Sequence, residues 1–290
     1  LGARRAAHRA GADIAIVLSG AGHVSSADSA NLFWVKQGVV FTPVLACGCL
    51  PGTTRAALIE SLKARGVRRI SGNVIGDDNV FDDRALGEGW QWDDLVWYYG
   101  AEVSGLQYNE GVIHLAVHGT SPGNRARIDV DPDVGYIQLV NRTSTTSGGG
   151  IREGYSRDLS SNRFVVSSSV PAGRVEREAV AVSNPTQYFI KTLVAVLERE
   201  GIDVDGEPID VDEWDGPDIR YEQMTRVATH LSPSLKNIVA ETNTESNNVY
   251  AEHLLRTLGA HQYTGDEYVP GSARSGVSAM EPFLNRSGID

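Results

Sequence analysis

Apolar and polar residues alternate along three short segments in the middle of the chain, and this alternation most limits what the chain can fold into. The segments are residues 112–117, 127–130 and 136–140, and Gly, Pro and Asn separate them. Alternation with a period of two is typical of β-strands that bury one face. We therefore expect the region from Ile70 to Val175 to be rich in β-strands.

Helical signals lie on both sides of this region. Thr54 can cap a helix that carries Leu58 and Leu62 on one face and ends before Gly66. In the last third, helices are expected from residue 184 to 201, from residue 232 onward and from about residue 246 to 259. The second of these helices is expected to bury Leu235, Ile238 and Val239.

Composition excludes several classes of protein. The 290 residues are 41% hydrophobic and carry a formal charge of -11. Nucleic-acid binding that relies on phosphate neutralisation needs blocks of Lys and Arg, and none is present, so we expect no nucleic-acid partner. The longest apolar runs are far shorter than the roughly 18 residues that span a bilayer, so we expect no transmembrane segment.

Residues 143–150 are Ser, Thr and Gly only, and this composition predicts a flexible loop or a crossing between subdomains, and not a core element, at a candidate domain boundary. Residues 119–123 match the glycine-serine-glycine elbow of serine hydrolases. Pro122 lacks the backbone N–H that such an elbow needs after its serine, so we interpret this segment as an ordinary turn.

Two clusters of acidic residues could form ligand-binding sites. The acids of residues 210–218 resemble a calcium loop in composition but lack its spacing, which favours a solvated acidic loop and no metal site. Residues 77–78 and 82–83 lie near five aromatic residues and could line a sugar-binding groove with them. An aromatic core patch is the favoured interpretation, because large aromatic side chains are usually buried. The aromatic residues are Trp90, Trp92, Trp97, Tyr98 and Tyr99.

The most informative segment is the Ser-x-Asn element formed by Ser246 and Asn248, which we expect at a helix start. Such an arrangement would put a hydroxyl and a carboxamide into one cleft, where both could contact a substrate. Alone the pattern is common, and a serine that merely caps its helix is the simpler explanation. We expect the two side chains to face a shared cavity at the foot of a helix, and an open surface with no pocket beside them would overturn the interpretation.

The surrounding sequence adds context to this element. Over about residues 58–290 the chain resembles the D-Ala-D-Ala carboxypeptidase and endopeptidase family, the class C low-molecular-mass penicillin-binding proteins. The resemblance is carried by residues 66–78, by the aromatic stretch 90–101, by Ala181-Val182-Ser183-Asn184-Pro185, and by Glu245-Ser246-Asn247-Asn248 with Ala251-Glu252-His253-Leu254-Leu255. It implies that Ser246 and Asn248 are catalytic and form the second active-site element.

The resemblance also implies a fold and partners. It implies an α/β (α+β) chain, namely an incomplete β-lactamase/transpeptidase-like domain with inserted β-rich domains, preceded by a small α/β fragment. The β-rich insert would cover about residues 75–178, and the helical part about residues 179–290. Peptidoglycan peptides and β-lactams would be the partners, and the location would be periplasmic or extracytoplasmic.

Two elements of that family are missing from this chain. The family needs Ser-x-x-Lys for its nucleophile and base and Lys-Thr-Gly for its third element. The residues three positions before Lys36, Lys63, Lys191 and Lys236 are Phe33, Glu60, Tyr188 and Pro233, so no Ser-x-x-Lys is present. No Lys-Thr-Gly is present either. The chain alone is therefore expected to be inactive.

Residues 1–57 resemble a different family. They resemble fold-type IV pyridoxal-phosphate aminotransferases and aminodeoxychorismate lyases, through residues 30–35, 40–43 and 50–55. The resemblance implies that Gly52, Thr53 and Thr54 would hold a cofactor phosphate. The Schiff-base lysine would lie before residue 1, and the glutamate expected near Ser26 is missing, so we expect no cofactor.

The chain is thus interpreted as an aminotransferase-like remnant joined to most of a serine-type D-Ala-D-Ala carboxypeptidase that acts on peptidoglycan stem peptides. Two alternatives remain open. The first is a non-catalytic peptidoglycan-binding protein that keeps the β-rich insert. The second is a pyridoxal-phosphate enzyme fragment whose function is defined by residues 1–57.

Overall fold

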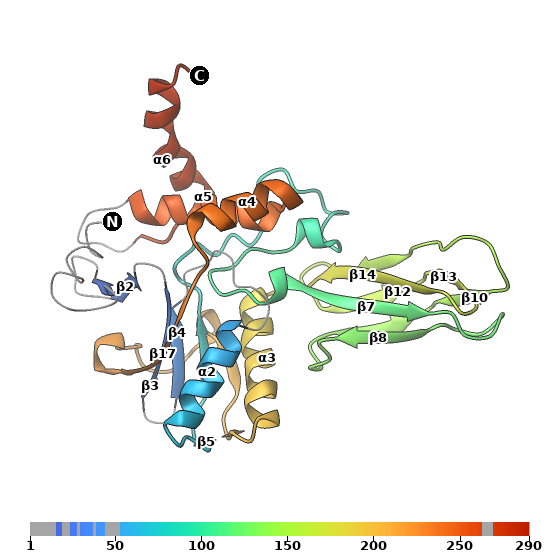
Figure 1. The fold of residues 1–290 in the computed structure, drawn as a ribbon, viewed down its shortest axis with the longest axis horizontal. Helices are drawn as coiled ribbons and strands as arrows, with labels where there is room; N and C mark the ends of the chain where they lie inside the picture. The colour runs from blue at the N-terminus through green and yellow to red at the C-terminus, as the bar shows by residue number, and fades with distance from the viewer. Residues whose placement is uncertain are drawn as a thin grey trace.

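The computed structural model describes residues 16–18, 24–27, 30–36, 39–43, 53–262 and 269–289. Side chains are described from Leu58 onward, except at residues 230, 231 and 262. The architecture is mixed α/β, as the sequence predicts. Figure 1 shows a sheet with helices packed on it, a group of helices above the sheet, and an elongated group of strands that projects to one side.

The largest sheet has the strand order β1-β2-β3-β4-β6-β16, and β17 pairs with β3. β4 pairs with β6 and β6 with β16 in parallel, whereas β17 and β3 are antiparallel. A small parallel pair joins β5 to β15. The strands are β1 (Ile16–Leu18), β2 (Val24–Ala27), β3 (Ala30–Lys36), β4 (Val39–Pro43), β5 (Arg69–Ile70), β6 (Val74–Asp77), β15 (Asp203–Val204), β16 (Pro208–Asp210) and β17 (Thr225–Leu231).

Helices α2 (Thr53–Ala64) and α3 (Pro185–Arg199) share one apolar core with this sheet. Leu58 and Leu62 of α2 are buried, and Gly66 follows the helix with a left-handed backbone, which confirms the predicted helix. Asn184 caps α3 by accepting a hydrogen bond from the backbone N–H of Gln187. The expected helix from residue 184 to 201 is therefore confirmed.

The strands β7 to β14 form the projecting group, which we call the β lobe. One sheet has the order β14-β7-β8, a second has the order β11-β12-β9, and β10 pairs with β13. The alternating segments of the sequence become β7, β8 and β9, as predicted. The strands are β7 (Val112–His118), β8 (Arg127–Asp131), β9 (Gln138–Asn141), β10 (Ser144–Thr146), β11 (Tyr155–Arg157), β12 (Arg163–Val166), β13 (Ser169–Pro171) and β14 (Val175–Ala181).

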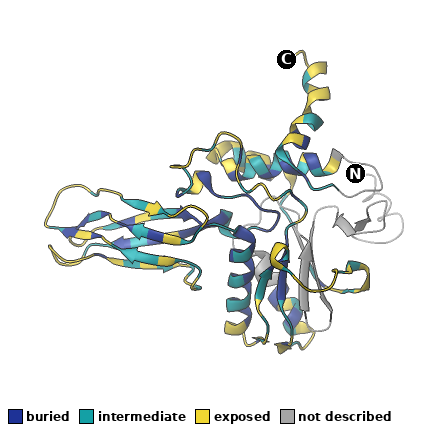
Figure 2. Cartoon of the chain, turned by 180° about the vertical axis from the view of Figure 1, so that it is seen from behind, coloured by how far each residue is buried: buried dark blue, intermediate teal, exposed yellow. Residues whose placement is uncertain are grey.

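The β lobe has an apolar core that includes Ile113, Leu115 and Phe164, and Figure 2 shows buried residues along its strands and along α3. Tyr188 of α3 belongs to the same core, stacks on Tyr136 with ring centroids 5.2 Å apart, and is fully buried. An aromatic side chain of this size contributes much apolar area to a core. It therefore ties the β lobe to the helix that packs on the large sheet.

The expectation of a flexible loop at residues 143–150 is wrong for its first half. Residues 144–146 form β10, and Thr143 and Thr145 are buried. The Thr143 hydroxyl accepts a hydrogen bond from the Ala126 backbone N–H, and the Thr145 hydroxyl accepts one from Thr120. Threonine satisfies backbone donors inside a fold in this way, and composition alone does not reveal it.

Three helices form the group above the sheet: α4 (Leu235–Glu245), α5 (Asn248–Gln262) and α6 (Ala273–Arg286). The expectation that α4 buries three apolar residues is wrong for two of them. Ile238 is buried, but Leu235 is 64% exposed and Val239 is 39% exposed. Among the described helices, none has both the length and the apolar content to cross a bilayer.

Helix α5 also extends beyond the stop predicted at Gly259. A Cβ at Gly259 would lie 2.2 Å from the Ser275 Oγ and 2.8 Å from the Gly276 backbone nitrogen. Gly259 is therefore a point where α6 approaches α5 closely, and not a helix end. A glycine signal in sequence cannot separate these two uses.

Candidate active site

The Ser-x-Asn element lies at the junction of α4 and α5. Ser246 ends α4 in a left-handed conformation with φ 54° and ψ 44°, and its side chain is exposed. Helix α5 begins at Asn248, and its first turn is capped by Asn247, whose side-chain oxygen accepts a hydrogen bond from the Tyr250 N–H at 3.0 Å. The predicted helix start at Ser246 is thus two residues early, because the chain must first end α4.

The Asn248 carboxamide is exposed and held in place by a backbone group. Its nitrogen donates to the carbonyl oxygen of Tyr99 at 3.0 Å. Tyr99 belongs to a short 3-10 helix, η1 (Tyr98–Gly100), at the base of the β lobe. The contact therefore fixes one side chain of the Ser-x-Asn element against a segment far away in sequence.

A carboxylate that the sequence analysis missed supports the same junction. Glu110 accepts a hydrogen bond from the Asn247 side-chain nitrogen at 2.9 Å and one from the Tyr250 hydroxyl at 3.2 Å. Its backbone is left-handed, with φ 57°, inside the 3-10 helix η2 (Asn109–Gly111). Such a conformation costs free energy in a residue other than glycine. One acidic side chain thus holds both the cap and the first turn of α5.

His253 lies one turn further along α5 and is fully enclosed. Its ring nitrogens lie 2.7 Å from the Val249 carbonyl oxygen and 3.0 Å from that of Ser104, and its ring meets Phe81 edge to face. Burial lowers the pKa of His253 to about 4, and the two carbonyl contacts offset this only in part. The imidazole is therefore neutral at pH 7.

This burial predicts an acid-labile fold. Because the pKa of His253 is about 4 in the folded state and about 6.5 in an unfolded chain, the unfolded state takes up the proton first as pH falls. The free energy of unfolding should then fall by about 2 kcal/mol between pH 8 and pH 5 through this residue alone.

Urea unfolding of the parent chain and of His253→Gln across this pH range tests the prediction. The difference in stability between the two proteins should shrink as pH falls. Exposed His261 provides the matched control, and His261→Gln should follow the parent at every pH. An imidazole resonance of His253 that titrates near pH 6.5 would contradict the prediction even if the variant does not fold.

The aromatic segment that runs from Trp90 into η1 differs from its expected form. The predicted core patch is wrong for three of its members, since Trp92 is 78% exposed, Tyr98 55% and Tyr99 39%. Trp97 is half-buried and packs edge to face against Tyr155. Trp97 is the member that packs against the core of the β lobe, a core formed by aliphatic side chains of the strands together with Phe164 and Tyr188.

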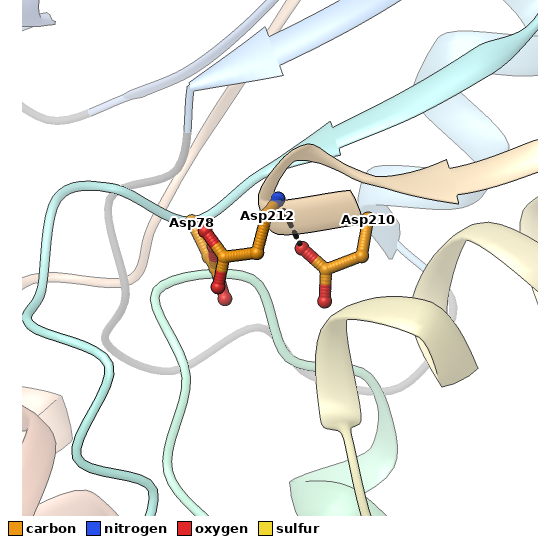
Figure 3. A group of neighbouring side chains, drawn as sticks. All are labelled: Asp78, Asp210 and Asp212. Carbon is orange, nitrogen blue, oxygen red and sulfur yellow. Dashed lines mark hydrogen bonds between the residues drawn. The ribbon is translucent and has the colours of Figure 1, made fainter. Parts of the chain in front are cut away.

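A second polar centre lies where strands β6 and β16 end side by side. Carboxylate oxygens of Asp78, Asp210 and Asp212 lie within 4.8 Å of one another, and Figure 3 shows the Asp212 backbone N–H donating to Asp210. Parallel neighbours in a sheet bring their carboxyl ends to one edge, which explains the juxtaposition. The expected solvated loop is therefore wrong for Asp210, which is buried, whereas Asp212, Glu213, Asp215 and Asp218 are exposed as predicted.

These acids line a cavity of about 190 Å³ together with Asp82, Asp83 and Glu102. Burial raises the pKa of Asp210 to about 6, and the nearby charge of Asp78 adds to this, while a hydrogen bond from Asn184 opposes it. Carboxylate oxygens are ligands for hard cations such as Ca²⁺ and Mg²⁺. The three carboxylates are thus the group, among the described residues, in which a divalent cation could bind.

Two further cavities are lined by residues that the structure describes. One of about 180 Å³ lies near Arg256 and the start of α6, and one of about 570 Å³ lies on the β lobe. Ser246 and Asn248 line none of the three cavities. The expectation that they share a cavity therefore finds no support in these pockets, and their catalytic roles remain predictions.

Comparison with known proteins identifies the family. The model of the D-Ala-D-Ala carboxypeptidase 3 (S13) family matches residues 48–290. The chain belongs to this S13 family. D-alanyl-D-alanine carboxypeptidase from Actinomadura sp. (strain R39) is 27% identical over 242 residues, which cover 81% of this chain and 43% of that protein. DacB from Haemophilus influenzae is 23% identical over 253 residues, which cover 82% of this chain and 49% of DacB.

Solved S13 relatives share the fold. The crystal structure of penicillin binding protein 4 (dacB) from Haemophilus influenzae matches with a TM-score of 0.71 and 20% identity, over 90% of this chain and 58% of that chain. The same protein complexed with a β-lactam matches with a TM-score of 0.63 and 17% identity, over 90% of this chain and 56% of that chain. The S13 chain thus spans about half the length of the curated relatives it matches.

The N-terminal resemblance is also found. The model for amino-transferase class IV matches residues 1–75. Branched-chain-amino-acid aminotransferase from Escherichia coli (strain K12) is 43% identical over 61 residues, which cover 21% of this chain and 20% of that enzyme. The predicted phosphate contacts cannot be traced, since Gly52 lies outside the described residues and the side chains of Thr53 and Thr54 are not described.

Proposed function

We propose that residues 58–290 carry the peptide-recognition part of a serine-type D-Ala-D-Ala carboxypeptidase that acts on peptidoglycan stem peptides outside the cytoplasm. The observation that carries the proposal is the Ser-x-Asn element at the start of α5 in a chain of the S13 family. The exposed Ser246 hydroxyl stands two residues from a carboxamide that Tyr99 holds in place. A hydroxyl and an amide in this order suit contact with a peptide carbonyl and its leaving amine.

In the complete reaction, a serine oxygen would attack the penultimate D-Ala carbonyl and the bond to the terminal D-Ala nitrogen would break. Water would then release the acyl group from the serine. Ser246 would pass a proton toward the leaving amine, and Asn248 would hold the substrate carbonyl. This chain has no Ser-x-x-Lys and no Lys-Thr-Gly, so we propose that it binds the peptide without cleaving it.

Mass spectrometry and NMR together test this proposal. After incubation with a penicillin, the chain should show no covalent gain in mass. N-acetyl-Lys-D-Ala-D-Ala should bind reversibly and shift the backbone amide signals of residues 246–250, and the peptide should stay intact. Asn248→Ala should raise the Kd of the peptide, measured by titration of these shifts, by about fivefold, the effect of one exposed polar contact.

Asn285→Ala, which removes an exposed asparagine of α6, is the matched control and should bind the peptide as the parent does. A stoichiometric penicilloyl adduct would show that the chain contains a nucleophile after all. Peptide binding that is unchanged in Asn248→Ala would remove the proposed role of the carboxamide.

A second candidate is a non-catalytic protein that binds peptidoglycan. The observation that favours it is the large, charged cavity on the β lobe, far in sequence from Ser246. In this case the β lobe would supply the main contact with the cell wall, and the Ser-x-Asn element would be a remnant.

A further inference from the structure

The largest of the three cavities lies on the outer face of the β14-β7-β8 sheet and measures about 570 Å³. This volume is within the range of small-molecule sites. Most of its lining comes from residues whose side chains point away from the core of the β lobe, the buried core residue Leu115 also borders it, and Tyr98, at 55% exposure, stands beside it. Neither the Ser-x-Asn element nor the acidic cluster contributes to it.

Strand register explains why this face is hollow. Ala116 of β7 lies between Arg177 on β14 and Asp129 on β8. In the next row of residues on the same face, two positions along the strands, His114 lies between Ala179 and Asp131. Two alanines thus form a low floor, and longer charged side chains rise on the two edge strands.

Arg177 on β14 lies across the floor from Asp129 and Asp131 on β8, and Glu178 of β14 also lines the cavity. Glu178 pairs with the buried Leu115 in the strand register, and its carboxylate already accepts a hydrogen bond from the Ala179 backbone N–H. Arg177 is on β14, and Asp131 is on β8, two strand spacings across the sheet and two residues along it, which places their backbones about 12 Å apart. Both residues are exposed, and neither makes a hydrogen bond or ion pair with another residue in the part of the chain that the structure describes. Asp129 is already engaged, because it pairs with Arg127.

This distribution selects one kind of ligand. A phosphate or nucleic acid would meet the carboxylates of β8, and a polycation would meet Arg177. A neutral sugar would leave both charges without a partner. A ligand with a carboxylate at one end and an ammonium about 12 Å away would pair with both, and the Tyr98 ring could cover its aliphatic part.

We propose that this groove binds a zwitterionic peptide of the cell-wall stem type, with its carboxylate on Arg177 and its ammonium on Asp131. The inference rests on the proposed function for the identity of the peptide, and it adds a second peptide contact on the β lobe. The groove would hold a strand of wall peptide while the Ser-x-Asn element meets the terminal D-Ala residues of another.

Amide NMR of the full chain with N-acetyl-Lys-D-Ala-D-Ala tests the groove. The peptide carries the required lysine ammonium and terminal carboxylate. Signals of residues 114–116, 129–131 and 177–179 should shift on binding. Capping the lysine amine with acetyl, or converting the carboxylate to an amide, should each raise the Kd obtained from these shifts by about fivefold, the upper range of an exposed ion pair.

Two variants place the charges. In Arg177→Gln, the peptide with a free carboxylate should bind no more tightly than its amide. In Asp131→Asn, the peptide with a free lysine ammonium should bind no more tightly than its acetylated form. Arg163→Gln and Asp158→Asn neutralise an exposed ion pair elsewhere in the β lobe and should leave binding unchanged. Since all four positions are exposed, the variants should fold as the parent does.

The outcomes separate this proposal from the proposed function. Shifts at residues 246–250 without shifts in the groove would overturn the groove and leave the function standing. Shifts in the groove alone would support the groove and remove the proposed function. Shifts at neither place would overturn both proposals. If a neutral N-acetylglucosamine trimer bound the groove as tightly as the peptide does, the groove proposal alone would be overturned.

Discussion

Replacing Arg256 with methionine should lower the free energy of unfolding by about 3 to 5 kcal/mol. The Arg256 side chain is 1% exposed, and it lies 3.2 Å from Glu252 on its own helix and 3.3 Å from Asp82 in the loop after β6. Methionine keeps much of the volume and removes the charge. Two partly buried carboxylates would then lose their partner, which is the costly way to break a buried ion pair.

Urea unfolding at pH 7, followed by circular dichroism, measures this effect. Arg163→Met removes an arginine that is 44% exposed and pairs with Asp158, so it should change stability by no more than about 1 kcal/mol. Equal losses in the two variants would mean that burial does not set the value of the Arg256 contacts.

A methyl group added at Gly276 should destabilise the contact between α5 and α6 by about 3 kcal/mol or more. A Cβ at this position would lie 2.1 Å from the Leu255 carbonyl oxygen, which is backbone and cannot rotate away. Gly276→Ala would therefore push the two helices apart. Helix propensity alone predicts the opposite sign, a gain of about 1 kcal/mol.

Thermal unfolding of Gly276→Ala decides between these two signs. Gly150→Ala is the matched control, because a Cβ there would meet nothing within 4 Å, and its midpoint should stay close to that of the parent. A Gly276→Ala protein as stable as the parent would show that α6 can shift without cost.

The sequence alone determined the elements whose signals are local. Alternation predicts β7, β8 and β9, since a strand that buries one face must repeat every second residue. Asn184-Pro185 predicts the start of α3, because a helix cap is likewise a contact between residues that are close in sequence. The resemblance carried by residues 66–78, 90–101, 181–185 and 245–255 was enough to predict the D-Ala-D-Ala carboxypeptidase family, which the family match over residues 48–290 confirms.

Tertiary structure alone decided what surrounds these elements. Glu110 meets Asn247 across 137 positions, and no pattern near either residue predicts that contact. The register of β14, β7 and β8 sets Arg177 and Asp131 on opposite edges of one hollow. Glycine has two uses, so Gly259 predicted a helix end where the fold needs a close helix contact. Contacts of this kind depend on how distant segments pack, and a local pattern carries no information about its distant partner.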